Sequence, residues 1–219
     1  MIIDAFLKRT EWPGDEPVLA VAWESASSSP STQWWIPPAG HGAPRLDGIY
    51  EQILEGDRQL FVGSRPSALP GAVQEVIRNA SEQVAAALQH LGYCGRCSFD
   101  HLVVGDPKGE FALRFTECNG RWGGTSTPMH LVDRIVRGPR PPYRAQDFQH
   151  DRLLEFGFRE IRDRLGPSLF NRGTQTGRYI LYNVGPLAAH GKLDVIALGD
   201  TQAEAEQALL ADFPRLLGL

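Results

Sequence analysis

The sequence is poor in lysine and cysteine, and it has no long apolar run. Only three of its 219 residues are cysteines, which is too few for a disulfide framework. No apolar run approaches the roughly 20 residues that cross a bilayer, and the first residues lack the basic stretch and apolar core of a secretory signal. These absences predict a cytoplasmic protein with no membrane partner.

Charge and composition bound the class of protein further. The formal net charge is −4 and the sequence pI is about 5.9, which argues against a nucleic-acid partner. Hydrophobic residues make up 42% and charged residues 22% of the chain, as is ordinary for a globular protein with a sizeable core. One domain, or a domain with an appendage, accounts for this length.

Apolar periodicity and turn residues predict an α+β fold in which helices flank an antiparallel β-sheet. We expect a β-rich opening from Ile2 to about Ser64, with strands at Val18–Trp23, Thr32–Ile36 and Gly48–Leu54. The later expected elements are helix Pro70–Leu91, hairpin Ser98–Glu117, helix Pro128–Val136, helix Asp151–Leu165, strands Arg178–Tyr182 and Lys192–Leu198, and a final helix opened by a capping box at Thr201–Glu204 with Leu209, Leu210, Phe213 and Leu217 facing inward. The breaker-rich segment Gly138–Tyr143 divides the chain into units of residues 1–137 and 138–219.

The predicted hairpin brings two acidic residues together. Asp106-Pro107-Lys108-Gly109 is a strong turn signal between two β-rich runs. The loop length places Asp100 directly opposite Glu117. The same register places Leu102 opposite Phe115, so each apolar stripe ends in an acid. Because adjacent carboxylates repel each other, a divalent cation is the expected partner of the pair.

The second strand of this hairpin ends in three polar groups at alternate positions. Glu117, Asn119 and Arg121 point to one side of an extended strand. Carboxylate and amide oxygens suit Mg²⁺, and a guanidinium suits phosphoryl or carboxylate oxygens. The alternatives are a solvated strand end, or a salt bridge from Arg114 or Arg121 to the acidic pair.

A glycine pair then precedes a helix. Gly123 and Gly124 let backbone N–H groups approach a ligand, and the helix dipole favours an anion there. Thr127 is the expected N-cap and Pro128 the expected first helical residue. A tight turn without a ligand is the alternative.

These residues resemble the ATP-grasp superfamily of carboxylate–amine ligases, and the fold resembles the large, carboxy-terminal lobe of that superfamily. The resemblance rests on an aspartate followed, after a hairpin, by the pattern Glu117-x-Asn119-x-Arg121-x-Gly-Gly. Further segments are most similar to the branch that contains the pheganomycin-type peptide ligase, namely Ser29–Gln33, Glu51–Leu54, Phe61–Ser64 and Val184–Leu187.

The resemblance implies a set of roles and cofactors. The implied cofactors are ATP and Mg²⁺, and the implied metal ligands on the nucleotide phosphates are Asp100, Glu117 and Asn119. Arg121 is the implied catalytic residue, because it stabilises the acyl-phosphate reaction centre. Ile2–Leu7 resembles the strand and hinge that hold the adenine, with Asp4, Phe6 and Leu7 as nucleotide-binding residues. The expected substrate-binding residues are Gly123, Gly124 and Thr125.

The implied reaction forms an amide from a small-molecule carboxylate and an amine, such as an amino acid or peptide, through an acyl phosphate. The chain starts at the implied hinge, has lysine only at positions 8, 108 and 192, and has no glycine-rich segment before Gly40. We therefore expect a separate amino-terminal lobe as a partner, or a loss of activity. A non-catalytic subunit that binds metal or nucleotide, and a metal-dependent phosphohydrolase, are the alternatives.

Overall fold

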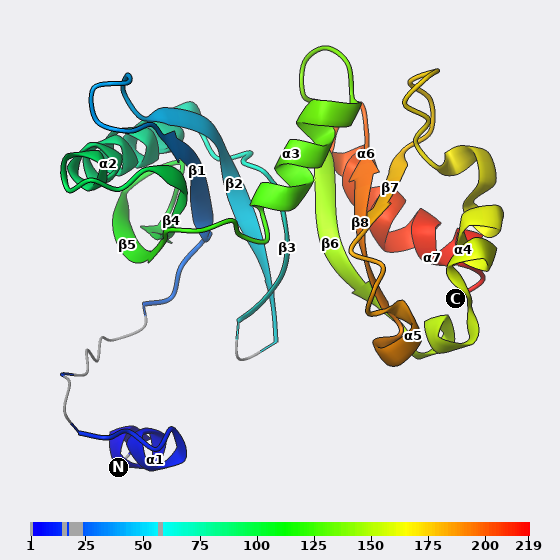
Figure 1. Cartoon of the computed structure of the whole chain (residues 1–219), viewed down its shortest axis with the longest axis horizontal. Helices are drawn as coiled ribbons and strands as arrows, with labels where there is room; N and C mark the ends of the chain where they lie inside the picture. The colour runs from blue at the N-terminus through cyan, green and yellow to red at the C-terminus, as the bar shows by residue number, and fades with distance from the viewer. Residues whose placement is uncertain (1, 15–16, 18–23, 57–58) are drawn as a thin grey trace.

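The computed structural model describes residues 2–14, 17, 24–56 and 59–219, and within them it contains one eight-stranded sheet (Figure 1). Neighbouring strands are antiparallel throughout, in the order β5-β4-β1-β2-β3-β6-β8-β7. Their bounds are β1 (Pro30–Ile36), β2 (Arg45–Glu55), β3 (Leu60–Pro66), β4 (Gly95–Gly105), β5 (Phe111–Asn119), β6 (Tyr143–Gln149), β7 (Tyr179–Tyr182) and β8 (Lys192–Leu198). The predicted α+β class is confirmed, and the predicted strand Val18–Trp23 lies outside the described residues.

Helix α2 (Gly71–His90) covers one face of the first half of the sheet, as its apolar spacing predicts. Its Val73 and Ile77 are fully buried in a cluster with Val103 of β4. The two adjacent tryptophans of β1 divide between the faces, because Trp34 is buried beneath α2 while Trp35 is 40% exposed. The face of β1 and β4 opposite α2 carries Ser31, Gln33, Ser98 and Asp100, which line one cavity.

Helices pack on both faces of the second half of the sheet. Met129 and Val132 of one helix share a core with Ala145 and Ile196 on one face, and Figure 1 shows this helix in front of β6. The other face is covered by helices from the carboxy-terminal part of the chain. The helices of this half are α3 (Ser126–Ile135), α4 (Phe158–Leu165), α5 (Leu187–His190), α6 (Gln202–Gln207) and α7 (Phe213–Leu217), with 3-10 turns η1 (Asp151–Glu155) and η2 (Gly166–Ser168).

Two predicted helices of this half are interrupted. The predicted helix Asp151–Leu165 is wrong as a single element, because Phe156 is extended (φ −101°, ψ 128°) and separates η1 from α4. The final helix contains a π-helical turn, η3 (Ala208–Asp212), between α6 and α7. The prediction that Leu210 faces inward is also wrong, since it is 55% exposed, whereas Leu209 is buried as expected.

The beginning of the chain is a helix and not the predicted strand. Helix α1 (Ile2–Arg9) contains the segment that we expected to form the adenine hinge. It lies apart from the sheet in Figure 1, and Phe6 on it is 48% exposed. The β-rich opening therefore begins at β1 within the described residues.

The two halves of the sheet are joined at β3 and β6. The pairing there involves Gly63 with Gln146 and Ser64 with Ala145. Strands from both of the predicted units, residues 1–137 and 138–219, thus belong to one continuous sheet. None of the described helices is long and apolar enough to cross a membrane.

Candidate functional site

The acidic pair is formed as predicted, but through a β-bulge. Asp100 of β4 lies opposite Glu117 of β5, and the next pair is His101 with Phe115. Two steps along β5 thus match one step along β4, so Thr116 is the extra residue. Because of the bulge, the side chains of Phe115 and Glu117 lie on opposite faces of the sheet, although the two residues are two positions apart.

This bulge corrects the predicted register of the hairpin. Leu102 pairs with Arg114, and not with Phe115 as expected. The Phe115 ring contacts the His101 ring edge-on at 5.6 Å between centroids, and His101 lies close to Ser81 of α2. Phe115 therefore lies on the α2 face, while Glu117 lines a cavity together with Asp100 on the opposite face.

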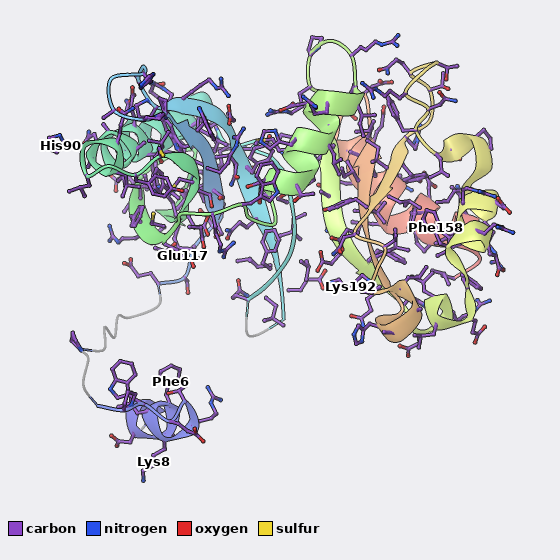
Figure 2. The ribbon with its side chains drawn as sticks, viewed as in Figure 1. Phe6, Lys8, His90, Glu117, Phe158 and Lys192 are labelled. Atoms are coloured by element: carbon purple, nitrogen blue, oxygen red, sulfur yellow. The ribbon has the colours of Figure 1, made fainter. Side chains whose placement is uncertain are left out.

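The cavity has a volume of about 490 Å³ and collects polar side chains from four strands. The predicted residues that line it are Asp100, Glu117, Asn119, Arg121, Gly123, Gly124 and Thr125. Glu117 is labelled in Figure 2 at the β4–β5 hairpin and is exposed to solvent. The structure thus brings together every predicted metal, catalytic and substrate-binding residue in one place.

Asp100 is the most buried acid of the site. Asp100 is 8% exposed, and its Oδ1 has no hydrogen-bond partner among the described residues. Burial raises the pKa of Asp100, the nearby polar side chains of Ser31 and Gln52 oppose this, and the negative charge of Glu117 raises the pKa further. A cation beside Asp100 would relieve both the burial penalty and the repulsion.

Asn119 and Arg121 continue this polar row by hydrogen bonding. Asn119 Nδ2 donates to Asp100 Oδ2 at 3.2 Å, and Arg121 Nη2 donates to Asn119 Oδ1 at 2.9 Å. The guanidinium therefore contacts the amide and not the acidic pair, which argues against the salt-bridge alternative. A cation between Asp100 and Asn119 would require the amide to turn its oxygen inward.

The donor set fits a magnesium ion that also carries phosphate oxygens. Among the described residues no three His, Cys, Asp or Glu side chains converge to hold a metal. The candidate set is instead two carboxylates and one amide, from Asp100, Glu117 and Asn119. Mg²⁺ commonly takes only one or two carboxylates and completes its shell with water and phosphate oxygens.

Helix α3 begins two residues earlier than predicted. Its first residue is Ser126 and its N-cap is Thr125, so the predicted N-cap role of Thr127 is wrong. Ser126 Oγ accepts a hydrogen bond from the Gly123 N–H at 3.1 Å and donates to Gln33 Oε1 at 2.8 Å. These bonds attach the glycine loop to β1 and hold the start of α3 at the cavity.

Gly124 is packed against an aromatic ring at the rim of the cavity. A Cβ added to Gly124 would lie 2.7 Å from Cε1 of Phe61, which comes from β3. Only glycine fits here without displacing the ring. The close approach places the backbone of the loop at the cavity wall.

The three residues expected to hold the adenine are not brought to this site. Asp4, Phe6 and Leu7 lie on α1, and none of them lines the cavity. Their predicted strand is a helix, so the structure gives their nucleotide-binding role no support.

The sequence reasoning missed three polar residues that support the site. Ser31 pairs with Asp100 across β1 and β4, while Gln33 and Gln52 line the same cavity. A signal was present, because Ser29, Ser31 and Gln33 alternate along a strand whose other residues include the buried Trp34. The order of strands, which brings β1 beside β4, was not visible in the sequence.

No protein-family model and no curated protein sequence matches the chain. Among solved structures, it is similar to N5-carboxyaminoimidazole synthase from Aspergillus clavatus in complex with ADP and 5-aminoimidazole ribonucleotide. The identity is 13% and the TM-score 0.62, over 98% of this chain and 57% of that one. N5-carboxyaminoimidazole ribonucleotide synthetase from Thermus thermophilus gives 16% identity and a TM-score of 0.57, over 89% and 52%.

A third similar structure is glycinamide-RNase-transformylase T from Mycobacterium tuberculosis, with 11% identity and a TM-score of 0.56, over 91% of this chain and 57% of that one. The chain therefore spans little more than half the length of these proteins. Identities this low show the fold alone. The predicted fold, an antiparallel sheet flanked by helices as in the large ATP-grasp lobe, is confirmed by these matches.

Proposed function

We propose that the chain is the metal- and nucleotide-binding lobe of an ATP-dependent carboxylate–amine ligase. One observation carries the proposal, namely that Asp100, Glu117, Asn119 and Arg121 line one cavity and that Asp100 Oδ1 has no partner there among the described residues. The fold supports it, since the similar structures include synthases in complex with ADP and with ATP.

In this proposal Asp100, Glu117 and Asn119 would hold Mg²⁺ with ATP. The bound Mg²⁺·ATP supplies the phosphoryl group, and the metal neutralises its developing charge. Arg121 and the backbone N–H groups of the glycine loop would orient the substrate carboxylate and the transferred phosphoryl group. The substrate carboxylate becomes an acyl phosphate, the amine displaces phosphate, and the products are an amide, ADP and phosphate.

We also propose the class of substrate and the metal. The segments that resemble the pheganomycin-type branch favour an amino acid or peptide as substrate, and Mg²⁺ as the metal. A cytoplasmic location remains a prediction from the sequence.

A second candidate function is a non-catalytic lobe that binds metal, nucleotide or a partner. The chain spans 57% and 52% of two similar enzymes, so about half of each of those enzymes has no counterpart in the given residues. A separate lobe that completes the nucleotide site would make activity depend on a second chain. The two candidates therefore differ in whether any turnover appears when that second chain is supplied.

The proposal is tested by measuring ATP-dependent ADP release with a panel of amino acids, with and without a co-expressed amino-terminal lobe. We expect Glu117→Gln to reduce turnover by about 10² or more, because a metal ligand loses its charge. Glu110→Gln, in the exposed turn of the same hairpin, is the matched control.

Equal turnover by Glu117→Gln and the parent chain would remove Glu117 from the site. If the parent chain shows no turnover with any partner but binds Mg²⁺·ATP in calorimetry, the non-catalytic function is the correct one.

A further inference from the structure

A second cavity of about 540 Å³ adjoins the first one and shares two of its lining residues. Phe61 and Gly124 line both cavities. Their close packing makes them the partition between the two spaces. The second cavity lies on the α3 face of β6, β8 and β7, beside the first turn of that helix.

The floor of this cavity is acidic. Asp147 of β6 lies directly opposite Asp194 of β8, and Tyr182 of β7 lies opposite Asp194 on its other side. Lys192, labelled in Figure 2, pairs with Asp147. Two carboxylates therefore face one ammonium group, and the row retains one negative charge when both acids are ionised.

Two buried polar atoms of the cavity wall lack a partner among the described residues. Asp194 is 7% exposed; its Oδ2 accepts from Asn183 Nδ2 at 2.9 Å, but its Oδ1 has no partner. Ser64 is 1% exposed and its Oγ also has none. Buried polar atoms are usually hydrogen-bonded, so two such oxygens in one cavity indicate a missing donor.

We propose that this second cavity binds the positively charged ammonium group of the amine substrate. Asp194 Oδ1 and Ser64 Oγ would accept hydrogen bonds from the ammonium, and Asp147 would add negative charge. The proposal rests on the proposed ligase function, since a ligase needs an acid and an amine in neighbouring sites.

The distribution of charge between the two cavities supports this division. Arg121 lines the first cavity together with Asp100 and Glu117, whereas no arginine or lysine among the described residues lines the second cavity. The acidic row lines the second. Burial raises the pKa of Asp194, and the nearby Asp147 carboxylate raises it further, so a bound cation would relieve both effects.

The test uses two-dimensional amide NMR spectra of the full chain, titrated with butylamine, butanol and butyrate. We expect butylamine alone to shift the amides of Asn183, Asp194 and Leu131. Asp194→Asn should weaken butylamine binding about tenfold, because a charged hydrogen bond is replaced by a neutral one. Ser64→Ala should weaken it less, and it keeps the test available if the first variant does not fold.

Asp163→Asn, on the exposed surface of α4, is the matched control and should bind butylamine like the parent. Equal shifts from all three probes, no shifts, or parent-like binding by both cavity variants would overturn the proposal.

A titration with Mg²⁺·ATP in the same samples separates the two proposals. Shifts at Asn119 and Arg121 that Asp194→Asn leaves unchanged would support the nucleotide site by itself. Asp194-dependent butylamine binding without any Mg²⁺·ATP binding, even with the co-expressed amino-terminal lobe, would support the ammonium site and contradict the ligase function. Mg²⁺·ATP binding without butylamine binding would overturn the ammonium site alone.

Discussion

The residue with the clearest pH-dependent effect on stability is His101, which lies next to the acidic pair but on the other face of the sheet. It is 1% exposed, and its Nδ1 has no partner among the described residues. Burial lowers the pKa of His101 to about 4. The folded state therefore excludes a proton that the unfolded state accepts near pH 6.5.

We expect His101 to make the protein less stable in mild acid. Between about pH 6.5 and about pH 4 the unfolded chain binds more protons, so the free energy of unfolding falls as the pH falls. Between about pH 7 and about pH 5, the free energy of unfolding should fall by about 2 kcal/mol less in His101→Gln than in the parent. Urea unfolding at the two pH values measures this difference.

The control for this prediction is His90→Gln, at the exposed end of α2 and labelled in Figure 2. It should retain the parent's pH dependence. An unchanged acid loss in His101→Gln would mean that another group causes it.

At the scale of elements, the β-bulge in β5 decides whether the two acids share a cavity. The predicted regular hairpin pairs Leu102 with Phe115 and Asp100 with Glu117, whereas the observed hairpin pairs Leu102 with Arg114. Continued without a bulge, this register would pair Asp100 with Thr116, so the extra residue Thr116 restores the pairing of Asp100 with Glu117. The Phe115 ring contacts Phe99 and His101 of β4, and short sequence patterns do not reveal a bulge of this kind.

Deletion of Thr116 distinguishes the bulged strand from a regular one. In the bulged strand the deletion leaves Glu117 opposite Asp100, so we expect Mg²⁺·ATP binding within about threefold of the parent. In a regular strand the same deletion would move Glu117 to the other face and abolish binding.

Calorimetry with Mg²⁺·ATP and cross-strand NMR contacts between Asp100 and Glu117 measure the result of this deletion. Loss of those contacts in a variant that still folds would show that the bulge does not position Glu117.

Helix ends were predicted well where one residue carries the signal. Gly92 ends α2 with a φ of 91°, and Thr201 Oγ1 accepts from the Glu204 N–H at 3.2 Å, as the capping box predicts. In a capping box the Glu204 side chain would accept a hydrogen bond from the Thr201 N–H. Here Glu204 Oε2 accepts instead from the N–H of the preceding residue, Asp200. The start of α3 was missed, since its glycine loop bonds to β1 and not to a local cap.

At the scale of the whole molecule, the junction of β3 with β6 holds the two halves of the sheet and both cavities together. Only two residue pairs are registered there. Glu206 of α6 strengthens the junction by ion pairs with Arg65 of β3 and Arg144 of β6. The second cavity exists because this junction places Ser64 in the same wall as the acidic row.

Gly63→Ala tests how far the halves depend on this junction. The added Cβ would lie 2.1 Å from the Ala145 carbonyl oxygen, so β3 and β6 must separate. We expect a loss of about 3 kcal/mol and a thermal transition that divides in two. Scanning calorimetry measures both effects.

The matched control is Gly71→Ala at the first residue of α2, where an added Cβ meets no atom within 4 Å. It should be neutral or stabilising by up to about 1 kcal/mol. A single unchanged transition in Gly63→Ala would contradict the role given to the junction.

The sequence by itself determined the α+β class, most strand positions and α2 with its glycine end. These features follow from local causes, namely side-chain period, turn residues and caps. Tertiary structure alone decided the bulge that keeps Glu117 opposite Asp100, that Ser31 and Gln52 lie beside Asp100, and that Ser64 lines one cavity with Asp194. Strand order and bulges depend on packing between segments that are distant in the chain, and a short sequence pattern carries no record of that packing.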